Sequence, residues 1–130
     1  MTYYTALVTL LAVALYFVFA TRVAAARGKY GVKLPATTGN PDFERTYRAH
    51  INTLEWLPIF LPSLWLFAIY ISDWVAAALG LVWIAGRIAY LIGYSNAANE
   101  RRRGFGIQAG ATIVLWVGAA GAILWRIVHA

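Results

Sequence analysis

The chain has 130 residues, of which 62% are hydrophobic and 12% charged, and its formal net charge is +6. Soluble domains average about 25% charged residues, so this composition indicates an integral membrane protein that forms one domain over residues 1–130. The lack of cysteine excludes disulfides, thiolate metal ligands and a cysteine nucleophile. The basic residues stand at the ends of apolar segments, which argues against a nucleic-acid partner.

Four apolar segments predict four transmembrane helices, over about residues 2–26, 41–71, 74–98 and 105–127. The run from Thr2 to Thr21 contains no charge. It can cross a hydrocarbon core of about 30 Å at about 1.5 Å per residue. It lacks the basic start of a signal peptide and is longer than a usual signal core, so we expect it to be retained. The predicted fold class is an all-α membrane protein with a four-helix bundle.

The second segment can begin with Asp42 as its N-cap, or with Asn40 as N-cap and Pro41 in the first turn. Pro58 and Pro62 remove backbone hydrogen bonds inside this helix and predict a kink. A very short turn follows, so the second and third helices should be antiparallel neighbours. Small residues in the fourth helix favour the close approach of another helix: Gly106, Gly110, Gly118 and Gly121.

The charges predict the orientation in the membrane. Basic residues gather in and beside two loops: Arg22, Arg27, Lys29, Lys33, Arg45 and Arg48 around the first, and Arg101, Arg102 and Arg103 in the other. The opposite side holds Asp73 and Arg126. By the positive-inside rule we expect both loops in the cytoplasm and both termini outside, in a bacterial inner membrane or a membrane of the endoplasmic-reticulum type.

A polar stripe runs along the second helix. Arg48, Asn52 and Glu55 are spaced i, i+4 and i+7, which places them on one face. A charge at membrane depth costs about 2.5–3.5 kcal/mol on insertion scales, so such groups usually face a partner or a cavity. Arg87 of the third helix lies at a depth similar to that of Glu55. The two could form a buried structural ion pair, or their helix faces could together bind a ligand.

The third helix carries Arg87, Tyr90 and Tyr94 on one face, and Arg101 shares it if the helix continues that far. Guanidinium groups can bind carboxylates bidentately, so these residues favour a small anionic or zwitterionic ligand. An arginine near a bound thiol would lower the thiol pKa below about 8.5 and raise the thiolate fraction. Arg102 and Arg103 fit a simple positive-inside anchor.

The sequence shows no Ser-His-Asp set, phosphate-binding loop or metal-binding cluster, so we expect no metal. His50 lies beside the polar stripe rather than on it. A lone histidine is more often a surface or interface group than a catalytic base, and the terminal His129 carries no signal.

Two stretches resemble one known family. The run GNPDFERTYRAHINTLE, Gly39 to Glu55, is similar to the signature of the membrane-associated proteins in eicosanoid and glutathione metabolism. The run GLVWIAGRIAYLIGY at 80–94 resembles the third helix of that family. The resemblance covers essentially the whole chain. The family includes microsomal glutathione transferases, the cysteinyl-leukotriene synthase and the non-catalytic lipoxygenase-activating protein.

The resemblance implies a homotrimer that binds glutathione, as co-substrate, between neighbouring subunits near the cytoplasmic face. The residues that match glutathione contacts of the second and third helices are Arg48, Asn52, Glu55, Trp56, Arg87, Tyr90 and Tyr94. Arg101 matches the arginine assigned to thiolate activation. Arg27 and His50 match positions that reach the tripeptide from the adjacent subunit.

Departures from the family pattern bear on the activity. Thr53 replaces a cysteine that is common in the signature. Trp56 stands where the leukotriene synthase has a tyrosine, and Gly28 where it has a second arginine, which weakens a prediction of leukotriene synthesis. Arg48 and Glu55 are present, whereas the activating protein has lost such polar groups, and this favours an enzyme.

The sequence therefore predicts a membrane-bound glutathione transferase that conjugates glutathione to a lipophilic electrophile, with a role in detoxification. Glutathione peroxidase activity toward a lipid hydroperoxide from the bilayer is a second expected reaction. The alternative is a non-catalytic membrane protein of the same fold that binds lipids or partner proteins. A small four-helix drug exporter is disfavoured because the first helix has no acidic residue.

Overall fold

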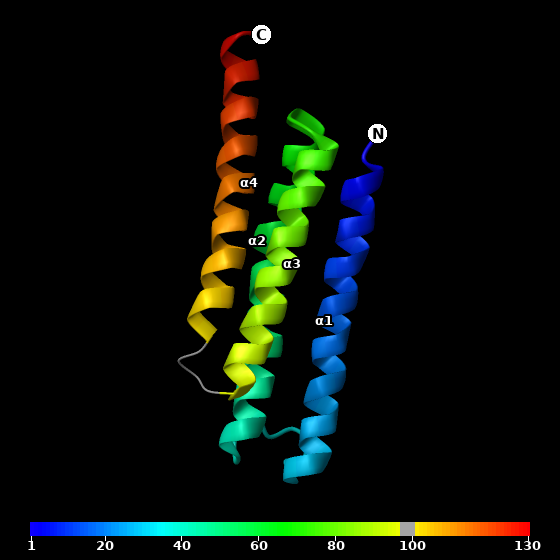
Figure 1. Ribbon diagram of the computed structural model, residues 1–130, viewed down its shortest axis with the longest axis vertical. Coiled ribbons are helices and arrows are strands. Elements are labelled where there is room, and N and C mark those ends of the chain that lie inside the picture. The colour runs from blue at the N-terminus through cyan, green and yellow to red at the C-terminus, as the bar shows by residue number, and fades with distance from the viewer. Residues whose placement is uncertain (97–100) are drawn as a thin grey trace.

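The computed structural model describes residues 1–96 and 101–130. Four helices run in alternating directions (Figure 1): α1 (Tyr3–Tyr30), α2 (Pro41–Tyr70), α3 (Asp73–Asn96) and α4 (Arg102–Val128). Each is long and apolar enough to cross a membrane, so the all-helical, four-helix prediction is confirmed. Residues 97 and 98, expected in the third helix, lie outside the described residues.

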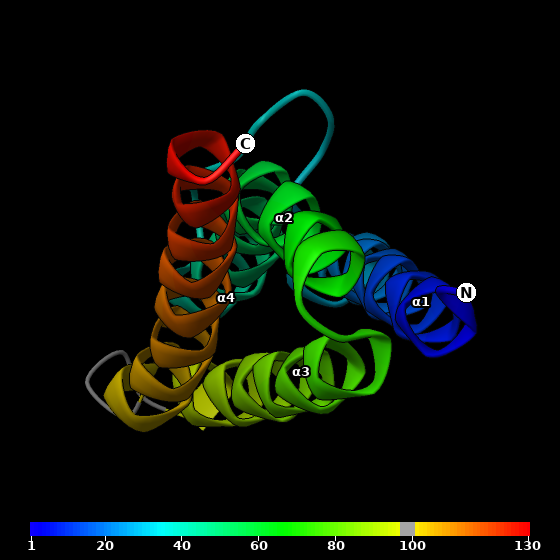
Figure 2. The same ribbon diagram turned by 90° about the horizontal axis from the view of Figure 1, so that it is seen from above.

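The two ends of the bundle differ in what they hold. Both chain termini and the turn between α2 and α3 lie at one end, which we call the terminal end (Figure 1). The loop between α1 and α2 and the start of α4 lie at the other, the loop end. Figure 2 shows α1 and α4 on opposite sides of the bundle, while α2 and α3 each pack against both α1 and α4.

The α1 helix extends to Tyr30, past its predicted end near residue 26. A single glycine inside a helix costs only about 1 kcal/mol, so Gly28 does not break it. The helix ends at Gly31, whose φ of 67° is the left-handed conformation that favours glycine. Arg27 then holds the following loop, because its guanidinium donates to the Ala36 carbonyl at 2.6 Å.

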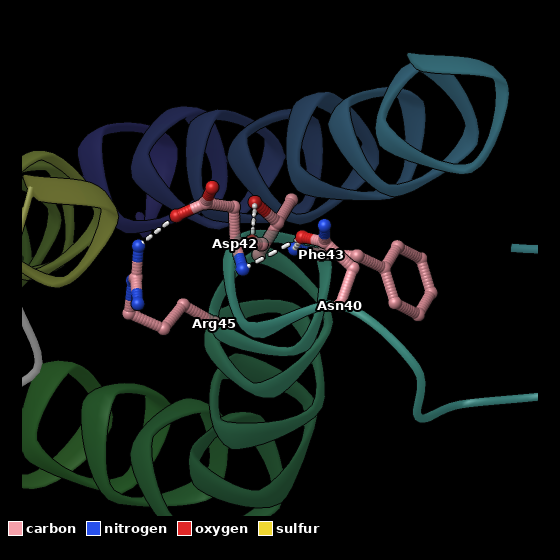
Figure 3. Close-up of polar contacts among 5 residues, drawn as sticks. Asn40, Asp42, Phe43 and Arg45 are labelled. Carbon is pink, nitrogen blue, oxygen red and sulfur yellow. Dashed lines mark hydrogen bonds and ion pairs between the residues drawn. The ribbon is translucent and has the colours of Figure 1, made fainter. Parts of the chain in front are cut away.

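The start of α2 distinguishes the two predicted caps (Figure 3). The Asn40 side-chain oxygen accepts hydrogen bonds from the backbone N–H groups of Asp42, at 2.9 Å, and Phe43, at 3.1 Å. Pro41 occupies the first turn, where its missing N–H costs nothing. Asn40 is therefore the N-cap, and Asp42 instead forms an ion pair with Arg45.

At the terminal end, α1 has its N-terminus capped by another helix. The Asp73 carboxylate accepts hydrogen bonds from the backbone N–H groups of Tyr4, at 3.1 Å, and Thr5, at 2.9 Å. Thr2, the α1 N-cap residue, makes no side-chain capping bond. The contact satisfies two N–H groups that a helix leaves free and joins α1 to the start of α3.

The main buried cluster contains residues of all four helices and includes one pair of stacked rings between α2 and α3. The rings of Phe60 and Trp83 stack with their centroids 4.1 Å apart, and both side chains are fully buried. Offset aromatic pairs at such distances contribute about 0.5–1.5 kcal/mol beyond their buried area. This stack positions the loop-end half of α3 beside the stripe of polar residues on α2.

Two glycines bring α3 and α4 together at the loop end. A Cβ atom on Gly104 would lie 2.1 Å from the Tyr90 backbone nitrogen and 2.6 Å from the Gly86 carbonyl oxygen. A Cβ atom on Gly86 would lie 2.7 Å from the Gln108 backbone nitrogen. Since backbone atoms cannot rotate away, only glycine permits this approach.

The small residues of α4 that were predicted to allow close approach of another helix behave differently from Gly104. Within the described chain, a Cβ atom on Gly106, Gly110 or Gly121 would meet nothing within 4 Å, while one on Gly118 would meet the Phe67 ring at 2.6 Å. The small-residue spacing thus does not mark the tightest contact of α4. The tightest contact of α4 is instead marked by two facing glycines, Gly104 on α4 and Gly86 on α3.

We expect Gly104→Ala to destabilise the bundle by about 2–3 kcal/mol, because its methyl group must push two backbones apart. Gly110→Ala is the matched control, because its methyl group enters open space and alanine favours a helix by up to about 1 kcal/mol. Unfolding in mixed micelles, followed by circular dichroism, measures both. Equal stability of the two variants would contradict the close contact.

Candidate functional site

A cavity of about 420 Å³ opens at the loop end, between α2, α3 and the start of α4. Its volume falls within the range of about 300–1,000 Å³ typical of small-molecule sites. The lining residues are Arg48, Asn52, Tyr90, Tyr94, Arg101, Arg102 and Phe105. Three are arginines and none of these described residues is acidic, so the cavity favours an anionic ligand.

Contacts between aromatic rings hold the side chains in the wall of this cavity in place. The rings of Tyr90 and Tyr94 stack with centroids 5.5 Å apart, and the Arg101 guanidinium carbon lies 5.4 Å from the centre of the Tyr94 ring. Trp56 packs edge-on against Phe105 at 5.5 Å and so supports the wall without lining it. Cation–π attraction therefore helps to hold Arg101 at the cavity.

Arg87 lies directly behind the cavity rather than in it. Its side chain has no exposed surface, and its guanidinium donates to the Asn52 side-chain oxygen at 2.9 Å and to the Thr53 hydroxyl at 2.6 Å. The same guanidinium lies 4.3 Å from the centre of the Tyr90 ring. Arg87 thus joins α3 to α2 and fixes two residues of the lining, Asn52 and Tyr90.

The Glu55–Arg87 ion pair, one of the two sequence-based alternatives, is absent. The single ion pair within residues 1–96 and 101–130 is Asp42–Arg45. Glu55 is exposed and does not line the cavity. Arg87 pairs instead with two neutral oxygens of α2, those of Asn52 and Thr53.

Sequence reasoning missed three residues of this region. Arg102, predicted only as a positive-inside anchor, and Phe105 line the cavity, and Thr53 holds Arg87 behind it. Thr53 departs from the family pattern, is fully buried and accepts a hydrogen bond from Arg87. The available signal was its place on the buried face of α2, since Ala49 and Leu57 precede and follow it by four residues. A polar residue on such a face needs a partner.

Two other predicted residues lie away from the cavity of their own chain. Arg27 donates to loop carbonyls, and its guanidinium carbon lies 4.9 Å from the centre of the Phe43 ring. His50 stacks on Tyr16 with ring centroids 4.6 Å apart. In the described parts of the chain, no group of three or more His, Cys, Asp or Glu side chains is arranged to hold a metal ion.

Together these features define a small multi-pass membrane protein with an arginine-lined cavity at one end of a four-helix bundle. The sequence model of the MAPEG family matches residues 5–121 of this chain. The chain belongs to the MAPEG family, as the sequence resemblance predicted.

Similarity to individual proteins supports the same family assignment. The chain is 53% identical over 122 residues to an uncharacterized protein of Synechocystis sp., which covers 94% of this chain and 89% of that protein. It is 46% identical over 97 residues to human microsomal glutathione S-transferase 2, covering 75% of this chain and 66% of the human protein. It is 40% identical over 122 residues to bovine leukotriene C4 synthase, covering 94% and 79%.

The Arg87 anchor can be tested with a pair of matched threonines. Thr53 and Thr112 are both buried, and each hydroxyl donates to the carbonyl four residues earlier. Only the Thr53 hydroxyl also accepts a hydrogen bond from Arg87. We expect Thr53→Val to lower the free energy of unfolding by about 1–3 kcal/mol, because it leaves a guanidinium N–H unpaired in the interior.

Thr112→Val should have a much smaller effect, because its hydroxyl has only the local acceptor. Both variants are compared by denaturant titration of the purified protein in micelles. Similar losses for the two valines would show that the Arg87–Thr53 hydrogen bond adds no stability.

Proposed function

We propose that the protein is a membrane-bound glutathione transferase and that the arginine-lined cavity binds glutathione. The observation that carries the proposal is a cavity of suitable volume with three guanidinium groups and no carboxylate among its described lining residues. It occurs in a chain that is similar to human microsomal glutathione S-transferase 2.

The chemistry of glutathione suits this lining. The tripeptide carries two carboxylates, one ammonium group, two peptide bonds and a thiol. Arg48 and Arg102 offer forked donors for carboxylates, and the Asn52 amide can pair with a peptide group. The buried charge of Arg87 adds positive potential behind the site without contacting the ligand. Glu55 does not line this cavity, and its assignment to the ammonium group rests on the family resemblance alone.

Arg101 has the catalytic role in this proposal. Its guanidinium, beside the Tyr94 ring, stabilises the glutathione thiolate, because a positive charge within about 4–6 Å lowers a thiol pKa. The thiol proton leaves to water, and the sulfur attacks an electrophilic carbon whose bond to its leaving atom breaks. With a lipid hydroperoxide, the thiolate attacks the terminal peroxide oxygen and the O–O bond breaks, which releases the lipid alkoxide to be protonated to the alcohol. The glutathione sulfenic acid then condenses with a second glutathione to give glutathione disulfide and water.

The proposed assembly is a homotrimer whose loop end faces the cytoplasm. Arg27 and His50 lie outside the cavity of their own chain, which fits a role beside the glutathione of the adjacent subunit. The basic residues near the loop end support the orientation. The lipophilic substrate would reach the site directly from the bilayer.

The decisive experiment measures the ultraviolet thiolate absorbance of glutathione bound to the purified protein. We expect Arg101→Ala to raise the pKa of the bound thiol by about 1–3 units and to remove most of the thiolate signal at neutral pH. Turnover of a generic electrophile should fall at least about tenfold as a consequence.

Arg103→Ala is the control, because Arg103 is exposed on the first turn of α4 and does not line the cavity. Equal thiolate signals in the two variants would remove Arg101 from the activating role. Should wild-type protein show neither turnover nor thermal stabilisation by glutathione, a non-catalytic binder of lipids or proteins is correct instead. Glutathione at a hundredfold excess over its dissociation constant should stabilise by about 2.7 kcal/mol.

The assembly has its own test. Native mass spectrometry of the protein released from detergent micelles should give a mass of three chains, each of 14.3 kDa. A monomer or dimer under conditions where glutathione still binds would refute the trimer and leave the proposed ligand intact.

A further inference from the structure

A second polar hollow lies at the loop end, on the flank between α1 and α2 and apart from the proposed glutathione site. Its volume is about 220 Å³, and its lining residues are Arg22, Ala25, Ala26, Lys29, Tyr30 and Thr46. It shares no lining residue with the larger cavity. Two of its described lining residues are basic and none is acidic.

The extension of α1 to Tyr30 creates this hollow. Arg22 and Lys29 are seven residues apart, so on a continuous helix they lie on one face, about 10 Å apart along the axis. Ala25 lies between them and leaves the space for a ligand. Had the helix ended near residue 26, Lys29 would not share a face with Arg22.

The depth of these side chains matches the boundary of a bilayer. From Tyr3 to Arg22 the helix rises about 28 Å, close to the hydrocarbon thickness of about 30 Å. Lys29 is about 10 Å further along, at the level of the lipid headgroups. The two basic groups therefore bracket the depth at which lipid phosphates lie.

An apolar track continues from the hollow toward the terminal end. Val18 and Leu11 precede Arg22 by four and eleven residues, so all three lie on one face of α1. Both apolar side chains are exposed, 48% for Val18 and 45% for Leu11. A lipid with its phosphate between Arg22 and Lys29 can lay an acyl chain along this face.

We propose that this hollow binds the headgroup of an anionic phospholipid. Arg22 and Lys29 pair with the phosphate, and the small side chain of Ala25 admits it. The Tyr30 and Thr46 hydroxyl groups complete the polar wall. The Lys29 ammonium lies 5.3 Å from the centre of the Tyr30 ring, which helps to hold it at the rim. Neither basic residue belongs to the single ion pair of the described residues, Asp42–Arg45.

The test uses the full-length protein in micelles with defined additions of phosphatidylglycerol or phosphatidylcholine, read out by thermal unfolding and by native mass spectrometry of retained lipid. Phosphatidylglycerol should bind and stabilise the wild type, and phosphatidylcholine should not. The double variant Arg22→Ala/Lys29→Ala should bind phosphatidylglycerol about 25-fold more weakly, at about fivefold per charge removed.

The double variant Lys33→Ala/Arg103→Ala is the matched control, because it removes the same charge from the same end of the bundle and leaves the hollow intact. It should retain phosphatidylglycerol as the wild type does. Ala25→Leu fills the hollow with every charge in place and should also weaken binding. Equal retention by both double variants would overturn the site, as would normal retention by Ala25→Leu.

Two further additions separate the lipid from soluble anions. Inorganic phosphate should not reproduce the stabilisation, and an equal effect of free phosphate would overturn the assignment to a lipid. Glutathione should stabilise the Arg22→Ala/Lys29→Ala variant as much as the wild type, because the two sites share no residue. A loss of lipid binding with glutathione binding retained thus separates this inference from the proposed enzyme activity.

Discussion

The buried guanidinium of Arg87 is the constraint on which the loop end of the bundle depends. A cation placed in a membrane-spanning helix with no exposed surface is costly unless its donors are satisfied. Here no carboxylate is used. The Asn52 and Thr53 oxygens of α2 accept two of its hydrogen bonds, and these two contacts hold α2 and α3 in one register. The Tyr90 ring on α3 faces its charge, while the Arg87 Nε has no partner among the described residues.

The choice of neutral partners has a consequence for the cavity. A glutamate paired with Arg87 would cancel its charge, whereas amide and hydroxyl oxygens leave it in place. The positive potential behind Asn52 and Tyr90 therefore adds to that of the arginines that line the cavity. The Gly86–Gly104 contact then brings the start of α4, with Arg101 and Phe105, against the same wall.

Features that extend along whole helices could be predicted from the sequence, whereas contacts between single pairs of residues could not. Apolar runs predicted four helices, and the residues at i, i+4 and i+7 placed Arg48 and Asn52 on a common face, where both line the cavity. Glu55 obeys the same spacing, but spacing does not decide which of several polar neighbours a buried arginine selects. The predicted end of α1 near residue 26 is also too early, because the helix continues to Tyr30 and is closed by the left-handed Gly31 and by the contact of Arg27 with the loop.

The arginines thus have different roles, which depend on how deeply each is buried and on the residues around it. Arg87 is enclosed and supports the cavity, Arg27 secures a loop, and Arg101 is held at the cavity mouth by an aromatic ring. The positive-inside rule counts all of them equally, because it concerns insertion and not binding. With a formal net charge of +6, the chain carries more cations than its own acids can neutralise. Anions from outside the chain balance this excess, and we propose that two separate hollows bind them, one between α2, α3 and α4 and one between α1 and α2.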